Sequence, residues 1–262
     1  MENELQLKEF VKDSYGKIAV NSENSCCSSG CGCGGSTVFM DEDYGSLNGY
    51  NPEADLGLGC GLPTNFAQIK KGDTVVDLGS GAGNDCFVAR AEAGENGKIV
   101  GIDFTPEMIA RARKNTQKRG FTNIEFIQGD IEKIPLDSDF ANVVISNCVL
   151  NLVPDKKAVF EEIYRVLKPN GHFSISDIVV TGDLPVKIKS AAEMYAACIS
   201  GAVMKDTYLK CIEEAGFKNI TVQKERSIIL PDEEAADFLS KDEIASYKKD
   251  PVIKSITVYA EK

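Results

Sequence analysis

Short β-branched runs alternate with helical stretches from Asp73 onward, and this pattern constrains the fold of the chain more than any other. Four of the runs read TVVDL, KIVGID, NIEFIQ and FANVVIS, and their length and composition are typical of buried strands. Strands that alternate with helices form βαβ units, in which the strands run parallel. The sequence therefore predicts an α/β fold with a doubly wound, mostly parallel sheet.

Local signals between these strands mark the ends of helices. Thr105 supplies an N-cap before Pro106 at the first helical position, and the helix that opens there is expected to end near Gly120. A further helix, from Asp155 to Lys168, is expected to stop at the proline and glycine of Pro169-Asn170-Gly171. The run HFSISDIVV follows it, which makes five parallel strands in outline.

The two ends of the chain differ from this central region. An amphipathic helix is predicted over Leu5–Ile18, because apolar residues recur there at helical spacing. The segment Asn21–Thr37, NSENSCCSSGCGCGGST, lacks apolar periodicity and is expected to be a mobile loop unless a ligand organises it. Later in the chain, helices are predicted across Val186–Ser200 and Asp206–Gly216, and the runs NITVQKE and SITVYAE are expected to extend the sheet edge.

The charge of the chain argues against a nucleic-acid substrate. A formal net charge of −11, with no Lys/Arg-rich stripe, repels phosphate backbones. No apolar run approaches the roughly 20 residues that cross a bilayer, and the N-terminus MENELQLKEF lacks the pattern of a signal peptide. We therefore expect a cytoplasmic protein with neither a membrane nor a nucleic acid as partner.

Nine cysteines and one histidine limit the chemistry that the chain can perform. In a reducing compartment, such a cysteine set favours metal, metalloid or redox chemistry over structural disulfides. The single histidine, His172, argues against histidine-rich zinc catalysis and against hydrolase triads, which need a positioned imidazole. We expect His172 to be structural.

A glycine-rich turn follows the first strand, in the segment Val75–Gly83, and the helical run DCFVARAEA comes after it. Glycine is needed there because the backbone must turn tightly and approach a ligand closely. Twenty residues after Gly83, the second strand ends in Asp103, which is placed to accept hydrogen bonds from ribose hydroxyls. The order strand, turn, helix, strand, acid predicts a nucleotide-type cofactor site.

The turn itself, GSGAGN, differs from the dinucleotide fingerprint and resembles motif I of class I S-adenosylmethionine methyltransferases. The segment Gln128–Ile131 resembles the adenine-binding acidic loop of the same family. The resemblance implies a Rossmann-like fold and S-adenosylmethionine as cofactor. The residues expected to bind it are Tyr15, Asp77, Gly79, Gly81, Gly83, Asp85, Asp103, Asp130, Ile131 and Asn147. Structural alternatives exist for Asp130, as a strand-end cap, and for Asp85, as a charge that favours a helix N-terminus.

Three further segments, SNCVLNLVPDK, GLGCGLP and CISGA, resemble the arsenite methyltransferase family. The match runs from about Tyr15 to Gly201, which is most of the chain. The resemblance implies that Cys148 and Cys198 are the principal arsenic thiolates and that Cys60 is a third ligand or a redox partner. The chain departs from the family at Gly57-Leu58, where many members carry an aromatic pair, and it is too short to match in full the additional C-terminal domain of longer relatives.

Arsenic chemistry agrees with this set of residues. Trivalent arsenic is soft and takes three thiolates in a pyramid, which leaves a lone pair on the open side. That lone pair is the nucleophile, so the reaction needs no general base and the scarcity of histidine is no obstacle. The expected substrate is therefore arsenite or one of its thiol conjugates.

Methyl transfer formally oxidises arsenic, so a source of electrons is also expected. Nearby thiols could return arsenic to the trivalent state by forming a disulfide, which a glutathione- or thioredoxin-type reductant would reopen. A further N-terminal cysteine of the family corresponds to Cys26 or Cys27, and alignment does not choose between the two. Together with Cys31 and Cys33 they could serve this redox step, bind zinc or deliver arsenic.

Other interpretations of the cysteines and of the whole chain remain. Cys86 and Cys211 lie at core spacing and are expected to be small buried residues. A small-molecule O-, N- or C-methyltransferase would use the cysteines structurally, and a metalloid-sequestering protein would bind arsenic without methylating it. We expect an N-terminal segment at 1–63, the Rossmann-like domain at 64–183, and substrate-side helices and edge strands at 184–262.

Overall fold

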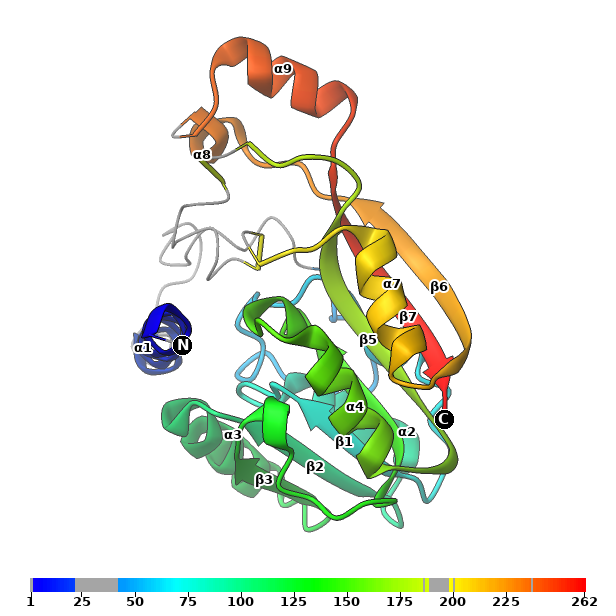
Figure 1. Ribbon diagram of the computed structural model, residues 1–262. Coiled ribbons are helices and arrows are strands. Elements are labelled where there is room, and N and C mark those ends of the chain that lie inside the picture. The colour runs from blue at the N-terminus through cyan, green and yellow to red at the C-terminus, as the bar shows by residue number, and fades with distance from the viewer. Residues whose placement is uncertain (1, 22–41, 186, 189–197, 200, 237) are drawn as a thin grey trace.

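The computed structural model describes residues 2–21, 42–185, 187–188, 198–199, 201–236 and 238–262. Within these residues, seven strands form one sheet in the order β3-β2-β1-β4-β5-β7-β6 (Figure 1). The strands are β1 (Thr74–Leu78), β2 (Lys98–Asp103), β3 (Ile124–Gln128), β4 (Ala141–Asn147), β5 (Leu167–Val180), β6 (Lys218–Ser227) and β7 (Ile253–Glu261). The first five run parallel, and β7 pairs antiparallel with both β5 and β6. The predicted parallel sheet with added edge strands is confirmed.

Helices lie on both faces of the sheet. The helices among the described residues are α1 (Glu2–Asn21), α2 (Asn84–Ala93), α3 (Pro106–Arg119), α4 (Lys156–Val166), α7 (Lys205–Glu214), α8 (Asp232–Ala236) and α9 (Lys241–Lys249), of which α8 and α9 stand beyond one end of the sheet. Short 3₁₀ helices occur at η2 (Pro63–Phe66), η3 (Ile131–Lys133) and η4 (Leu150–Leu152). In Figure 1, α4 and α7 lie in front of the sheet and α2 lies behind it.

Two core clusters show how the strand sequences divide between these faces. Val76 packs in the cluster that contains residues of α4 and α7, whereas its neighbour Val75 packs in the cluster that contains residues of α2 and α3. Successive side chains of a strand point to opposite faces, so a strand covered on both sides is apolar throughout. The continuous apolar runs in the sequence therefore reflect a sheet that is buried on both faces.

The helix predicted over Asp155–Lys168 is shorter in the structure, where α4 ends at Val166 and β5 begins at Leu167. Leu167 pairs with Ala141 of β4, so the chain returns to the sheet before the proline. Proline also disfavours a helical residue before it. The pairing of Leu167 with β4 therefore ends the helix two residues before the end that the Pro-Asn-Gly signal predicted.

Thr105 occupies the N-cap position of α3 as predicted, but its side chain makes no capping hydrogen bond. The predicted helix over Asp206–Gly216 corresponds to α7. Most of the helix expected across 186–200, and the cysteine-rich segment with Cys26, Cys27, Cys31 and Cys33, lie outside the described residues.

The predicted N-terminal helix is confirmed as α1, which lies beside α3 (Figure 1). Polar contacts attach it to the rest of the chain: the Lys8 ammonium pairs with Asp130 at 2.9 Å and also with Glu132, and Arg111 Nη1 of α3 donates to the Ala19 carbonyl at 2.9 Å. In the part of the chain that the structure describes, no helix is both long and apolar enough to span a bilayer.

Candidate active site

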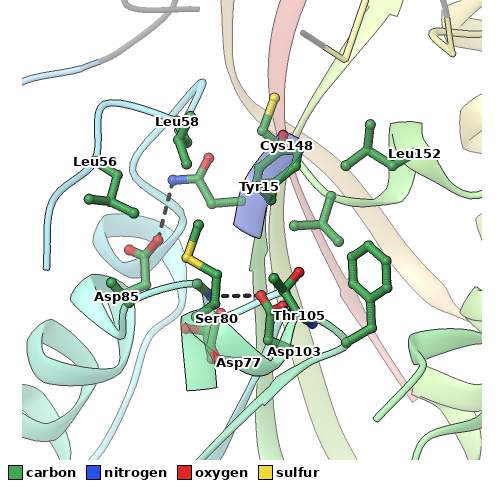
Figure 2. A pocket seen from close by; sticks show the side chains of 18 of the residues that line it. Tyr15, Leu56, Leu58, Asp77, Ser80, Asp85, Asp103, Thr105, Cys148 and Leu152 are labelled. Carbon is green, nitrogen blue, oxygen red and sulfur yellow. Dashed lines mark hydrogen bonds between the residues drawn. The ribbon is translucent and has the colours of Figure 1, made fainter. Parts of the chain in front are cut away.

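A pocket opens at the carboxyl ends of β1, β2 and β4, where α/β proteins commonly bind ligands (Figure 2). The β1–α2 turn lines its floor, α1 contributes Lys8, Val11 and Tyr15, and the segment 54–59 adds part of the wall. Leu58, where the family resemblance implied an aromatic residue in other members, lines this wall with an aliphatic side chain. Segments far apart in the sequence therefore enclose one site.

The glycines of the β1–α2 turn adopt backbone angles that other residues rarely take. Their φ values are +69° at Gly79, +50° at Gly81 and +96° at Gly83. A Cβ at Gly79 would lie 2.3 Å from the Val149 side chain, whereas one at Gly81 would meet nothing closer than Met108 Sδ at 4.0 Å. Gly79 is thus required by packing, and Gly81 leaves its side of the turn open where it lines the pocket.

Asp103 lies at the end of β2 with 7% of its surface exposed. Its Oδ2 accepts from the Gly81 N–H at 2.9 Å, and its Oδ1 accepts from the Thr105 N–H at 2.8 Å. Burial raises the pKa of this carboxyl, and the two backbone donors oppose the rise. The carboxylate is held in one orientation in the pocket wall, as a group that receives hydroxyl donors must be.

A second acid, Asp77, is buried beneath the same turn with 2% of its surface exposed. The Cys86 thiol donates to its Oδ2 at 3.2 Å. Burial raises the pKa of Asp77 well above its usual value, and the charge of Asp85 adds to the rise. Cys86 is fully buried among residues of α2 and β1, which confirms the prediction that it is a core residue, whereas Cys211 is only half-buried.

Asp130 and Ile131 both line the pocket beyond the end of β3. Asp130 caps η3 by accepting from the Glu132 N–H at 3.0 Å, so the cap proposed as an alternative to ligand binding is present. Its other oxygen pairs with Lys8 of α1. His172 does not line the pocket, and its Nε2 contacts the Ala67 carbonyl at 2.7 Å, as a structural residue would.

Cys60, Cys148 and Cys198, which are distant in the sequence, share one buried cluster next to the pocket. Their exposed fractions are 0%, 2% and 1%. The Cys198 thiol donates to the Cys148 carbonyl at 2.9 Å. The neighbouring thiols of Cys198 and Cys60, followed by burial, raise the pKa of Cys148 well above its usual value.

Only Cys148 of the three lines the pocket, and Figure 2 shows its sulfur at the opposite end from Asp103. Cys148 and Cys198 have φ values of +61° and +62°, a region that costs a non-glycine residue about 1–2 kcal/mol. Such strain is often found where a side chain must point at a ligand. Within the described ranges no three His, Cys, Asp or Glu side chains are already arranged around a metal position, so the three thiols are neighbours without forming a finished cage.

Tyr15 of α1 covers the space between the thiols and Asp103 (Figure 2). Burial raises the pKa of Tyr15 well above its usual value, and the nearby Cys198, Cys148 and Asp103 contribute in the same direction. Tyr15 therefore lies close to groups at both ends of the pocket. The assignment of Tyr15 to cofactor binding stays a prediction.

A buried polar group behind the thiols was not predicted. Asp177 of β5 is fully buried, and the Tyr208 hydroxyl donates to it at 3.1 Å. Burial raises the pKa of Asp177 to about 7, although the nearby Lys156 opposes the rise. An acid in the otherwise uncharged run SISDIVV was the signal for this group, because a charged residue inside a buried strand needs partners.

Known proteins resemble this chain over most of its length. Residues 69–216 match the methyltransferase domain family. An arsenite methyltransferase from Halobacterium salinarum is 40% identical over 247 residues, which cover 90% of this chain and 61% of that protein. One from Aquipseudomonas alcaligenes is 30% identical, with 89% of this chain and 68% of that protein covered. The chain thus spans less than two thirds of the Halobacterium relative.

Solved structures give the same result for the fold. An arsenic(III) S-adenosylmethionine methyltransferase from Chlamydomonas reinhardtii superimposes with a TM-score of 0.66 at 33% identity. The alignment covers 78% of this chain and 67% of that one.

Proposed function

Because the chain belongs to the arsenite methyltransferase family, we propose that it methylates trivalent arsenic held on its own thiolates, with S-adenosylmethionine as methyl donor. The single observation that carries this proposal is the convergence of Cys60, Cys148 and Cys198 beside the pocket. Core cysteines of a general small-molecule methyltransferase have no reason to meet there.

The pocket fits the cofactor by its donor set and by its open turn. S-adenosylmethionine, when bound, supplies a methyl group on a positively charged sulfur. Asp103 would receive the ribose hydroxyls, Gly81 leaves room beside the turn, and Asp130 and Ile131 would border the adenine. Asp85 would lie near the methionine end. Acidic groups around this pocket favour a cationic ligand.

The thiols would take up arsenic by ligand exchange. Each thiol forms an As–S bond as an As–O bond of arsenous acid breaks, and the thiol proton leaves with the released oxygen as water. Three exchanges therefore need no external base. Since the three thiols are not yet spread around one centre, at least one side chain must rotate as arsenic binds. Their burial then keeps water from the arsenic.

Cys148 decides which way bound arsenic faces. It is the thiol that lines the pocket, while Cys60 and Cys198 share its buried cluster without lining the pocket. An arsenic atom bonded to all three would therefore have its open side, with the lone pair, toward the pocket. The residues that surround this end, Val149 and Leu152 among them, are apolar and exclude competing nucleophiles.

Two expectations stay predictions. A thiol reductant is required to return arsenic to the trivalent state, and Cys26, Cys27, Cys31 and Cys33, which would take part, lie outside the described residues. The cytoplasmic location inferred from the sequence is likewise a prediction.

The direct test incubates the purified protein with arsenite, glutathione and methyl-labelled S-adenosylmethionine, and then separates the arsenic species. We expect label in methylated arsenic and stoichiometric S-adenosylhomocysteine. Arsenic binding without consumption of S-adenosylmethionine would instead indicate a sequestering protein. Retention of methyl transfer to another small molecule, with no arsenic product, would contradict the proposal.

A further inference from the structure

Asn147, the last residue of β4, makes contacts that its predicted role as a cofactor ligand does not require. Its Oδ1 accepts from the Cys60 backbone N–H at 3.0 Å. Its Nδ2 donates to the Gly61 carbonyl at 2.8 Å and to the Tyr44 hydroxyl at 2.6 Å. Both ends of the amide are therefore engaged by the part of the chain that carries Cys60.

The glycines on each side of Cys60 are explained by the same close approach. A Cβ at Gly59 would lie 2.8 Å from Asn147 Nδ2, and one at Gly61 would lie 2.5 Å from Ser176 Oγ. Real Cβ atoms essentially never come so near. The Gly-Cys-Gly segment thus lies directly against the ends of β4 and β5, at a distance that larger residues would prevent.

The hydrogen bond between Asn147 and the Cys60 backbone matters because Asn147 is next to Cys148 in the chain. Cys148 follows it in the chain, so the amide fixes the Cys60 loop to the residue adjacent to the second thiol. The Ser255 hydroxyl also donates to the Cys60 carbonyl, which holds the other side of the loop to β7. Hydrogen bonds from the Asn147 and Ser255 side chains to the Cys60 backbone therefore bring Cys60 and Cys148 together. The thiols themselves are too weak as hydrogen-bonding groups to do so.

Tyr44 extends the arrangement toward the pocket. Its hydroxyl lies 3.0 Å from both oxygens of Asp85, and Asn147 Nδ2 lies 3.3 Å from Asp85 Oδ2 (the dashed line to Asp85 in Figure 2). Asp85 stands in the first turn of α2 and lines the pocket. One side chain, Asn147, therefore connects the loop of Cys60 with a carboxylate of the predicted cofactor site.

We propose that Asn147 is a positioning residue that sets Cys60 beside Cys148, with Tyr44 linking its amide to Asp85. The Gly61 carbonyl and the Asp85 carboxylate can only accept, so they fix the NH₂ end of the Asn147 amide. The Tyr44 hydroxyl supports this orientation by accepting from Asn147 Nδ2 while it donates to Asp85. If the amide turned over, its NH₂ group would oppose the Cys60 N–H. This role deepens the proposed function, because it matters for arsenic only if the three thiols bind arsenic.

The first test needs no arsenic and no cofactor. The alkylation rate of Cys60 by iodoacetamide is measured by mass spectrometry in the parent chain and in Asn147→Ala. We expect the rate to rise at least tenfold, because release of the loop exposes a fully buried thiol. Asn142→Ala is the matched control, since Asn142 bonds the Thr74 N–H near the other end of β4, and it should leave the rate unchanged.

The second test measures arsenite affinity in the absence of S-adenosylmethionine, together with arsenic X-ray absorption to count sulfur neighbours. Asn147→Ala should bind arsenite at least tenfold more weakly and show two As–S bonds instead of three. Tyr44→Phe should lie between the parent and Asn147→Ala in both tests. Because Asn147 also lines the pocket, affinity for S-adenosylhomocysteine is measured in Asn147→Ala as well, and it should fall by a smaller factor than the affinity for arsenite.

Several results would overturn the inference. Unchanged Cys60 alkylation and unchanged As–S coordination in Asn147→Ala would do so, as would equal effects of Asn142→Ala. A large loss of S-adenosylhomocysteine affinity with normal arsenite binding would show that Asn147 is a cofactor-binding residue and does not position Cys60. If the parent chain binds no arsenite, the proposed function fails, and the alkylation result alone still decides the placement of Cys60.

Discussion

The two ends of the active-site pocket are built in different ways. The end at the glycine turn comes from one βαβ unit, in which the Gly79 N–H bonds the Ile102 carbonyl at 2.7 Å and Asp103 bonds back to the turn. The thiol end joins Cys60, Cys148 and Cys198, which come from three separate parts of the chain. Local sequence determines the first end, and long-range packing determines the second.

The two ends also differ in which residues adopt the left-handed backbone conformation. At the turn, the left-handed conformation falls on glycines, for which it carries little penalty. At the thiol end it falls on Cys148 and Cys198, for which it is strained. A thiol stands at these two positions at a cost in stability, as we expect if its side chain binds the substrate. Substitutions at each end should therefore separate cofactor binding from arsenic binding.

The largest expected effect is on arsenite binding by Cys148→Ser. A hydroxyl is a hard ligand, so the soft arsenic atom should lose about 100-fold or more in affinity, while binding of S-adenosylhomocysteine stays within about threefold. Isothermal titration of both ligands measures this. Cys86→Ser is the control at the turn, because serine can still donate to Asp77. Equal arsenite binding by the parent chain and by Cys148→Ser would contradict the assignment of arsenic binding to the thiol end of the pocket.

The converse experiment is Asp103→Ala. Loss of hydrogen bonds to a carboxylate costs roughly 1.5–3 kcal/mol, which predicts about a 10- to 100-fold lower affinity for S-adenosylhomocysteine. Arsenite binding, measured without cofactor, should be unchanged because Cys148 lies at the other end of the pocket from Asp103. Asp73→Ala, which alters the opposite end of β1, controls for general loss of stability. A parallel loss of arsenite affinity would show that the ends are coupled.

Gly79→Ala is expected to affect both ends to a smaller degree. The added Cβ would press on Val149, which follows Cys148, and would force alanine to a φ of +69°. We expect a stability loss of about 2–4 kcal/mol and about five- to tenfold weaker binding of both ligands. Gly120→Ala separates the two causes, since Gly120 has a φ of +66° and open space around its Cβ. If both variants lose equal stability, contact with Val149 contributes nothing.

The same contrast explains how much could be predicted from the sequence. The five parallel strands, the glycine turn and the place of Asp103 follow from residues near one another in the chain, and all are present in the structure. Tyr44 and Asp177 were missed, because each matters only through partners in distant segments. For the same reason, Asn147 was predicted only to bind the cofactor, and its hydrogen bond to the Cys60 backbone was missed.

The convergence of the cysteines could be predicted only through the family resemblance. Nothing in the spacing of Cys60, Cys148 and Cys198 indicates that they meet, and their contacts depend on β4, β5 and β7 lying side by side. The boundary between α4 and β5 shows the same limit on a smaller scale. There, the pairing of Leu167 with β4 outweighed a correct local stop signal.

The smallest expected effect concerns a surface contact of α1, the helix whose Tyr15 lies near both ends of the pocket. The Lys8 ammonium pairs with Asp130 and Glu132, but the side chains are 32%, 49% and 25% exposed. Exposed ion pairs contribute about 0.2–1 kcal/mol, so Lys8→Ala should weaken S-adenosylhomocysteine binding less than about fivefold. The difference should vanish at about 1 M salt, where charges are screened within roughly 3 Å. Lys12→Ala, on the same helix, is the control. A larger effect that persists at high salt would mean that Lys8 contacts the ligand directly, and that the helix belongs to the cofactor end alone.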